Sequence, residues 1–325
     1  MLQINYTIII PHKNIPELLK RCLASIPRRE DVQIIVVDDN SDPEKIDFEH
    51  FPGLGDPNVE VVFTKEGKGA GYARNIGLTK AVGKWLLFAD ADDFFNYCIN
   101  DILDEYVNSD ADIVYFKHNS LDSATYNTTN RLIQFRSYID YWFYSQHNAD
   151  ALLRYNHQSV WCKIFKRELV KKNNILFDEV SISNDVTFAY LSGYYAGSIN
   201  VDIRALYCYT VRQGSIRRSR LSIENKLDDL YVSGKRYVFY KKHGIKIYNE
   251  KNFVNTLTKL YFLNRNYFKK AKDILLDLGF TLGGIFGLCI CNIIIYIPKN
   301  IVIKLFPERK FLPVFNSKFR ELLRR

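Results

Sequence analysis

The chain has 325 residues, 47% of them hydrophobic and 25% charged, which excludes an intrinsically disordered protein and favours one enzyme-sized domain with an appendage. Its formal net charge of +9 suits nucleic acid, anionic lipid or phosphorylated substrates, and most of the excess lies in residues 298–325, which hold eight basic and two acidic residues. The six cysteines show neither a CxxC pair nor a histidine at metal-ligand spacing, which argues against zinc and redox sites.

Four short, β-branched apolar runs predict strands buried on both faces of a parallel sheet: residues 7–10, 34–37, 59–63 and 85–88. Helical apolar spacing fills two of the intervals, at residues 15–26 and 71–82. The same spacing returns at residues 99–107, before another apolar run at residues 113–116. Strands that alternate with helices predict an open α/β sheet.

The second half of the chain gives weaker local signals. Residues 122–130 are polar and predict a surface connection, whereas residues 138–213 are rich in aromatic side chains without a clean periodicity. Residues 221–242 and 250–276 predict long helices. We expect a catalytic domain over residues 1–220 and a helical extension over residues 221–325.

The segment 278–297 is uncharged and has the length of a membrane span. Basic residues flank it on both sides, so a single span would export one basic flank against the positive-inside tendency. We therefore expect a re-entrant or interfacial segment on an anionic membrane surface, with a pair of buried core helices as the alternative. No signal peptide and no nucleic-acid partner are expected. The predicted location is cytoplasmic, with peripheral or monotopic association at the inner face of the cell membrane.

Polar motifs follow three of the predicted strands: Pro11-His12-Lys13-Asn14, Asp38-Asp39-Asn40-Ser41 and Asp90-Ala91-Asp92-Asp93. In an open α/β sheet, loops at the carboxyl ends of neighbouring strands converge and bind ligands. Five carboxylates at that edge would repel one another unless a cation compensated them. Mg²⁺ or Mn²⁺ with a bound diphosphate fits such a set of oxygen ligands, and a turn or helix cap is the alternative for any single aspartate.

Four segments resemble, in order and spacing, the signature of family 2 glycosyltransferases with the GT-A fold: YTIIIPHKN at residues 6–14, IIVVDDNSD at 34–42, ARNIGL at 73–78 and WLLFADADD at 85–93. The resemblance is close over about the first 100 residues and weaker to about Ile216. It implies a mixed, mainly parallel α/β sheet flanked by helices. A C-terminal helical membrane-associating region would follow this domain.

The resemblance also implies a role for each matching acidic position. Asp39 would accept a hydrogen bond from the nucleobase, and Asp90 would lie near the ribose. Asp92 would bind Mg²⁺ or Mn²⁺, with Asp93 in support.

Four further positions belong to the same donor-binding motifs: Pro11, Asn14, Arg74 and Ala91. Arg74, near the start of a predicted helix, would face phosphate oxygens, with a surface salt bridge as the alternative. His12 and Lys13 stand where the family usually has Thr-Tyr or Ser-Tyr, which leaves the choice of nucleotide open.

An inverting sugar transfer needs a carboxylate that deprotonates the acceptor hydroxyl. Residues 177–185 resemble a later family segment in which Asp185 matches the base and Asn184 replaces the usual Glu. The alternatives are Asp185 as a plain helix cap and Glu179 as the base. Trp161 and Lys163 precede this segment at the family's spacing, and core packing explains Trp161 as well as acceptor stacking does.

Residues 207–216 resemble the family's closing segment. Arg212 and Ser215 would reach the donor phosphates from a loop that closes over the donor, and an ordinary basic surface loop is the alternative.

The resemblance implies an inverting, metal-dependent glycosyltransferase that uses a nucleoside-diphosphate sugar, with a UDP-sugar as the expected donor. A lipid-linked glycan in polysaccharide biosynthesis is the expected acceptor. A nucleotidyltransferase of similar fold would carry a glycine- and arginine-rich loop after the first strand, where this chain has Pro11-His12-Lys13-Asn14. An inactive membrane-bound scaffold would have little reason to keep both Asp92 and Asp185.

Overall fold

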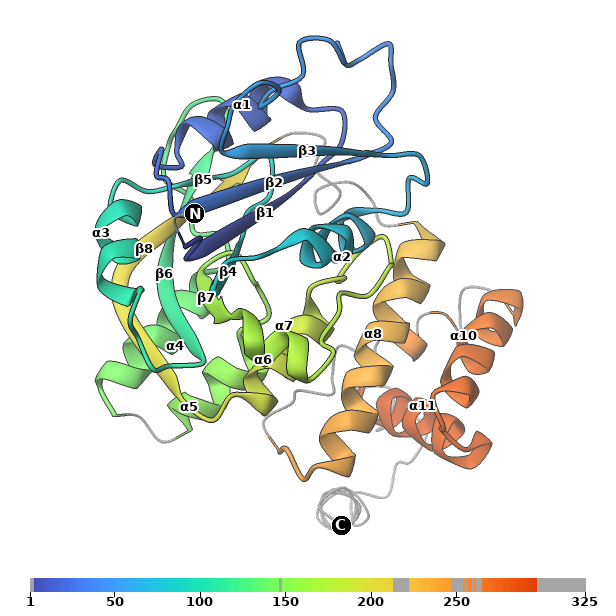
Figure 1. The fold of residues 1–325 in the computed structure, drawn as a ribbon. Helices are drawn as coiled ribbons and strands as arrows, with labels where there is room; N and C mark the ends of the chain where they lie inside the picture. Colours follow the sequence, from blue (N-terminus) through green and yellow to red (C-terminus); the bar gives the residue numbers. More distant parts are fainter. Residues whose placement is uncertain are drawn as a thin grey trace, which may run out of the picture. The chain divides into compact units, whose positions relative to one another are not determined.

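The computed structural model describes residues 3–145, 148–212, 222–246, 254, 256–258, 260 and 265–296. The chain divides into two compact units, Met1–Tyr248 and Asn249–Arg325. The first unit holds a single sheet with helices on both faces (Figure 1).

The eight strands of the sheet lie in the order β3-β2-β1-β4-β7-β6-β8-β5. Their bounds are β1 Tyr6–His12, β2 Val32–Asp39, β3 Val59–Thr64, β4 Trp85–Phe88, β5 Phe94–Phe95, β6 Ile113–Asp122, β7 Lys163–Lys166 and β8 Ile199–Val211. Strands β1 to β4 pair in parallel, as do β6 and β8, whereas β7 and β5 are antiparallel to their neighbours. The predicted mixed, mainly parallel α/β sheet is confirmed.

The helices of the first unit are α1 Pro16–Ala24, α2 Ala70–Lys80, α3 Ile99–Tyr106, α4 Ile133–Phe143, α5 Ala149–Ala151, α6 Arg167–Lys172, α7 Val186–Tyr195 and α8 Ile223–Lys242. A five-residue π-helical turn, Leu152–Asn156, follows α5. Two predicted helices, at residues 15–26 and 71–82, correspond to α1 and α2 within two residues at each end.

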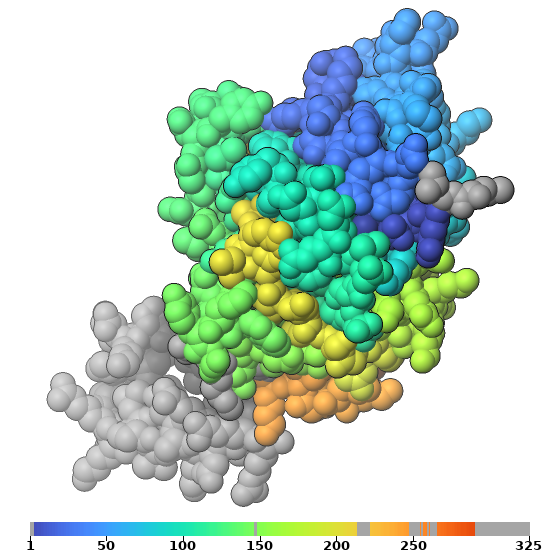
Figure 2. Space-filling view, turned by 60° about the vertical axis from the view of Figure 1, so that its left-hand side comes forward, coloured from blue at the N-terminus to red at the C-terminus, as the bar shows by residue number. Residues whose placement is uncertain are grey.

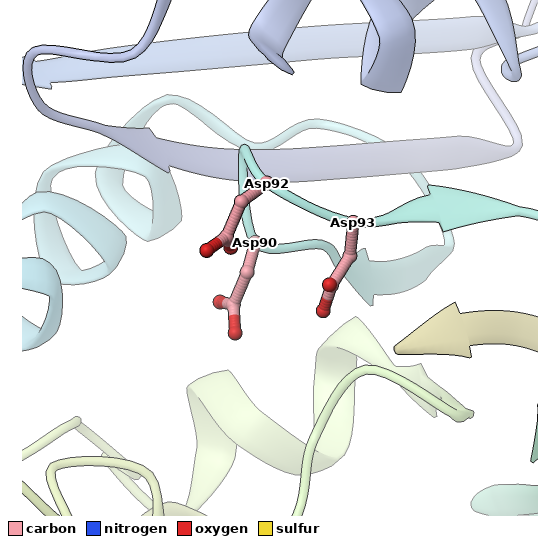
Figure 3. Close-up of side chains that lie close together, drawn as sticks. All are labelled: Asp90, Asp92 and Asp93. Atoms are coloured by element: carbon pink, nitrogen blue, oxygen red, sulfur yellow. The ribbon is translucent and has the colours of Figure 1, made fainter. Parts of the chain in front are cut away.

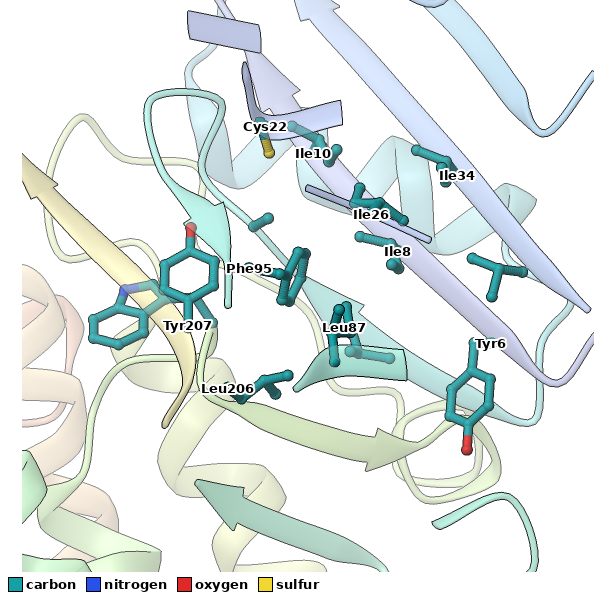
Figure 4. Close-up of a cluster of buried hydrophobic side chains, with 14 of the residues drawn as sticks. Tyr6, Ile8, Ile10, Cys22, Ile26, Ile34, Leu87, Phe95, Leu206 and Tyr207 are labelled. Atoms are coloured by element: carbon teal, nitrogen blue, oxygen red, sulfur yellow. The ribbon is translucent and has the colours of Figure 1, made fainter. Parts of the chain in front are cut away.

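Alternation along β1 builds two separate cores. Ile8 and Ile10 pack with the apolar stripes of α1 and α3, as the labelled side chains in Figure 4 show in part. Ile9, between them in sequence, points to the opposite face and packs with buried residues of α2, α6 and α7. Because both faces of β1 are covered, every residue of the strand is buried, which is why its sequence is a continuous apolar run.

Strand β8 joins the far half of the sheet to the segment after β4. Its end region pairs with β5, through Cys208 opposite Phe94 and Tyr207 opposite Phe95. Figure 2 shows the yellow β8 segment at the surface between teal and green segments from earlier in the chain. This pairing brings residues 112 and 114 positions apart in sequence beside the loop that follows β4.

The second unit contains α10 (Arg265–Asp277) and α11 (Leu282–Tyr296). Gly279 adopts a φ of 90° after α10, and the amide of Phe280 donates to the Leu275 carbonyl, so the glycine closes the helix. The predicted apolar segment 278–297 therefore begins at the end of α10, and α11 lies within this segment. Among the described residues, no helix is both long and apolar enough to cross a membrane.

Candidate active site

The carboxyl ends of β1, β2 and β4 meet at one edge of the sheet. His12 at the end of β1 lies in register with Asp38 of β2, and β1 also pairs in parallel with β4. The three polar motifs predicted to converge are therefore brought together by the strand pairing.

Asp38 is a buried carboxylate that organises this edge. The amide of Ile15 donates to Nε2 of His12, so Nδ1 carries the ring proton and donates to Asp38 Oδ1 at 2.8 Å. The amide and hydroxyl of Ser41 donate to the same carboxylate at 2.9 and 2.5 Å. Burial raises the pKa of Asp38, but the hydrogen bonds from His12 and Ser41 outweigh it and lower the pKa overall.

Asp39, the next residue, is 2% exposed and differs from Asp38 in its bonding. Its Oδ2 accepts from the amide of Gly69 at 2.9 Å and from Lys13 Nζ at 3.3 Å. Its Oδ1 is buried and lacks a hydrogen-bond partner within the part of the chain that the structure describes. A buried carboxylate oxygen in this state is costly and suits a ligand N–H or O–H donor.

Asn14 and Pro11 shape the end of β1. Asn14 has a φ of 59°, and its side-chain oxygen accepts from the amide of Asp42 at 2.8 Å while its own amide donates to Ser41 Oγ at 2.8 Å. Pro11 is buried in β1 opposite Val37. Both residues hold the β1 and β2 ends together beside Asp39.

The carboxylates of Asp90, Asp92 and Asp93 form an acidic cluster, with one ligand oxygen from each lying within 4.8 Å of the others. Figure 3 shows the three side chains extending from the same side of the turn after β4. Ala91, between them, is buried against the core and holds the turn. Their convergence is the one predicted from the sequence.

The electrostatics of the acidic cluster favour a bound cation. Burial, followed by the charges of Asp92 and Asp90, raises the pKa of Asp93 well above its ordinary value. Burial and Asp90 also raise the pKa of Asp92, against the lowering effect of Arg212. Asp93 Oδ1 accepts from the amide of Thr210 at 2.6 Å, and Oδ2 is buried with no partner among the described residues. This oxygen-only donor set fits Mg²⁺ or Mn²⁺.

Two arginines from distant elements touch Asp92. Arg212, after β8, places Nε 2.7 Å from Asp92 Oδ2, so it lies in the predicted donor region, paired with the acidic cluster. Arg21 of α1 donates to the carbonyl of Asp92 at 2.5 Å. Sequence reasoning missed Arg21, whose only sequence signal is a basic residue in the last turn of a helix that follows the first motif.

Tyr207 and Thr210 of β8 are also site residues that sequence reasoning did not assign. The hydroxyl of Tyr207 accepts from the amide of Asp90 at 2.8 Å, and Thr210 Oγ1 donates to the carbonyl of Asp92 at 2.6 Å. Both lie in or beside the segment that resembles the family's closing segment, which was the available signal.

Arg74 of α2 links the acidic cluster to the segment before α7. It is 5% exposed, pairs with Asp90, and donates from Nη1 to Asn184 Oδ1 at 2.8 Å. Arg74 is therefore buried and does not form the surface salt bridge that was the alternative. Because Asn184 precedes Asp185, Arg74 connects the acidic cluster to the segment that carries the predicted base.

Asp185 stands at the N-cap position of α7, with φ −86° and ψ −17°. Its side chain makes no capping hydrogen bond to the helix. The alternative that Asp185 serves only as a helix cap is therefore not supported within the described chain. The rival, Glu179, is exposed and approaches Asn75 Nδ2 only at 3.5 Å.

Trp161 and Lys163 belong to the interior. Trp161 is 5% exposed and stacks on Tyr207 and Tyr209 with ring centroids 5.0 and 5.8 Å apart, which favours core packing over acceptor stacking. Lys163 is fully buried, donates to the His157 carbonyl at 2.6 Å, and has its pKa lowered to about 7 by burial. Ser215 lies outside the described residues.

A family model and the similar known proteins all indicate a glycosyltransferase. The model of the family "Glycosyl transferase family 2" matches residues 7–173, just over half of the chain. An uncharacterized glycosyltransferase of Bacillus subtilis, EpsJ, is 24% identical over 257 residues, covering 74% of this chain and 70% of that protein. The glycosyltransferase GlyG of Streptococcus pneumoniae is 26% identical over 242 residues, covering 71% and 78%.

Among solved structures, residues 1–349 of S. aureus TarS in complex with UDP-GlcNAc align with a TM-score of 0.56 and 17% identity. The alignment covers 84% of this chain and 89% of that chain. At this identity the likeness concerns the fold, and it agrees with the predicted GT-A architecture.

Proposed function

The chain belongs to glycosyl transferase family 2, and we propose on that basis that it transfers a sugar from a nucleoside-diphosphate sugar to an acceptor hydroxyl with inversion at the anomeric carbon. The observation that carries the proposal furthest is the acidic cluster (Asp90, Asp92 and Asp93) beside Asp39 at one edge of the sheet. Asp39 and Asp93 each hold a buried oxygen without a partner in the described residues.

Asp39 is the proposed contact for the nucleobase. Its unpartnered Oδ1 can accept the imide N–H of uracil, while Gly69 and Lys13 fix its other oxygen. TarS, a protein of the same fold, was solved with UDP-GlcNAc, which supports UDP-sugars as the first donors to test.

Asp92 and Asp93 are the proposed ligands of Mg²⁺ or Mn²⁺, with Asp90 toward the ribose. Bound there, the cation would neutralise charge on the departing diphosphate. Arg212 is paired with Asp92 and lies close enough to the acidic cluster to pair with the diphosphate when the donor binds. Ser215 remains a proposed donor contact from the same segment.

Asp185 is the proposed general base. It removes the proton of the acceptor hydroxyl as the acceptor oxygen bonds to the anomeric carbon and the bond from that carbon to the diphosphate oxygen breaks. The resemblance of residues 177–185 to the family segment that carries the base supports this role.

The acceptor is proposed to be a lipid-linked glycan at the inner face of the cell membrane. The uncharged sequence 278–297 and the basic sequence 298–325 support an anionic membrane surface as partner. We propose a catalytic domain over residues 1–220 and a helical extension over residues 221–325, of which residues 278–325 serve membrane association.

The direct test is a panel of nucleotide-sugars with Mg²⁺ or Mn²⁺ and a lipid-linked acceptor, run on the wild type, Asp92→Asn and Asp185→Asn. We expect release of nucleoside diphosphate by the wild type and a loss of at least about a hundredfold in each variant. Asp185→Asn should retain donor binding, since it lies outside the donor motifs. Release of pyrophosphate would indicate a nucleotidyltransferase. Near-full turnover by Asp185→Asn would transfer the base role to Glu179.

A further inference from the structure

Helix α8 lies beside α7 in Figure 1 and contacts it. Val232 and Tyr240 of α8 form a buried cluster with Val186 and Tyr190 of α7. This apolar contact brings the first half of α8 to the segment just before α7. We call that segment, residues 178–185, the base loop, because it ends at Asp185.

Polar side chains of α8 bond to the middle of the base loop. Asp228 Oδ2 accepts from the amide of Ser181 at 2.9 Å and also from its hydroxyl. Asn225 Nδ2 donates to Ser181 Oγ at 2.8 Å, and Asp229 Oδ1 accepts from Ser183 Oγ at 3.0 Å. Each bond ends on a residue two to four positions before Asp185.

An ion pair fixes the start of the base loop. Lys235 Nζ lies 2.7 Å from Oδ1 of Asp178, a carboxylate that is 7% exposed. Removing the lysine would leave a largely buried charge without its counter-ion, which is far costlier than losing an exposed pair. Asn225, Asp228, Asp229 and Lys235 are named here the α8 anchor residues.

The opposite side of the base loop is closed by α2. A Cβ on Gly71 would lie 2.0 Å from the Asp178 carbonyl oxygen, so helix and loop are in direct backbone contact. Asn75 accepts from the amide of Phe177 at 2.9 Å, and Arg74 bonds to Asn184. The loop is thus held between two helices, and α2 is already part of the donor side of the site.

We propose that α8 is a positioning element for the reaction, and that the α8 anchor residues hold the base loop so that Asp185 faces the acceptor hydroxyl. This inference rests on the proposed function, which makes Asp185 the base. Among the described residues, the bonds from the α8 anchor residues to the first part of the chain end on the base loop and on none of the donor motifs, so they act through Asp185 and not on the donor. Displacement of a catalytic group by about 1 Å can cost about a hundredfold in rate.

The test compares Asp228→Ala and Lys235→Met with Asp228→Asn and Lys242→Met in the full chain. Lys242→Met is the matched control, because Lys242 is exposed in the last turn of the same helix. Asp228→Asn keeps an acceptor oxygen for Ser181 and should rescue most of the effect. Three quantities are measured: hydrogen exchange of residues 177–185, the affinity for UDP with Mn²⁺, and kcat for UDP release from the nucleotide-sugar selected above.

Asp228→Ala and Lys235→Met are expected to speed exchange across the base loop and to lower kcat by about tenfold to a hundredfold, with UDP affinity changed less than about twofold. Lys242→Met should match the wild type in all three. Unchanged loop exchange in both variants overturns the inference, and this readout needs no substrate. Faster exchange with an unchanged kcat, while Asp185→Asn is inactive, also overturns it.

Failure of the proposed function has a different signature. If Asp185→Asn turns over normally, the base assignment is wrong whatever the anchor variants do. A loss of UDP affinity in the anchor variants would mean a general structural role for α8 and would likewise contradict a positioning role.

Discussion

The buried Lys163 makes the stability of the folded chain depend on pH. It is fully buried on β7, and its ammonium group lies 4.8 Å from the centroid of the Tyr115 ring. Burial lowers its pKa to about 7, whereas a lysine in an unfolded chain has a pKa of about 10.4. Between these two values the unfolded chain binds more protons than the folded one, so this residue makes the unfolding free energy rise with pH.

We therefore predict that Lys163→Met loses a pH dependence that the wild type has. Below about pH 7 the folded wild type carries the full cost of a buried ammonium group, and above about pH 10 it carries none. The unfolding free energy of the variant relative to wild type should fall as pH rises across this range. Urea unfolding at several pH values measures it, with exposed Lys172→Met as the control. Parallel curves for Lys163→Met and wild type would contradict the prediction.

At the scale of elements, α2 is held by two glycines that face different neighbours. A Cβ on Gly77 would lie 2.4 Å from Ile9 Cγ2 in the sheet core, and one on Gly71 would meet the backbone of the base loop. The glycines let the helix approach both surfaces closely. The same helix therefore carries a packing contact and a contact with the base loop.

Alanine at these two glycines should separate stability from activity. Both Gly77→Ala and Gly71→Ala are expected to lower the unfolding free energy by about 1–3 kcal/mol through overpacking. Gly71→Ala should in addition lower kcat, because it displaces the loop that ends at Asp185. Chemical denaturation and kcat at a temperature where both variants are folded distinguish the effects. Equal kcat values in the two variants would refute the separate role of Gly71.

The sequence predicted the elements whose signals are local. Strands β1, β2 and β4 are largely apolar runs because both of their faces are covered, and the acidic cluster follows directly from β4. Strand β3 is the edge strand, contains Glu60 and is only partly buried, so the prediction that it is buried on both faces is wrong. Strand β5 has two residues and β7 has four with a lysine at each end, so neither has a recognisable period. The register of β8 depends on shifts between Phe116 and His118, which no local pattern reveals.

In the candidate site, too, the residues with a local sequence signal could be predicted and the long-range contacts could not. Asp39, Asp90, Asp92 and Asp93 could be predicted because each lies at the end of a predicted strand. The contacts of Arg21 and Asn184 could not, because they join residues 71 and 110 positions apart through the packing of α1 and α2. Contacts of this kind depend on tertiary structure, which strand and helix signals do not specify.

At the scale of the whole molecule, the chain consists of two compact units that meet in sequence after Tyr248. The proposed membrane association belongs to the second unit, which contains the uncharged sequence 278–297 and the basic tail. The proposed chemistry belongs to the first.

We predict that the full chain binds vesicles containing anionic lipid and that a chain ending at Tyr248 does not. Binding of the full chain should weaken with added salt, because basic side chains near the membrane surface supply about 1 kcal/mol each at low ionic strength. Co-sedimentation with anionic and neutral vesicles measures this. Retained vesicle binding by the shortened chain would place the membrane contact in the first unit.

The central claim is that the acidic cluster holds a divalent cation together with a nucleoside diphosphate. Calorimetric titration of UDP, with Mn²⁺ and again with EDTA, on wild type and Asp92→Asn tests it most directly. We predict binding that requires Mn²⁺ in the wild type and is lost in Asp92→Asn. UDP binding of equal affinity in EDTA, or unchanged by Asp92→Asn, would contradict the account.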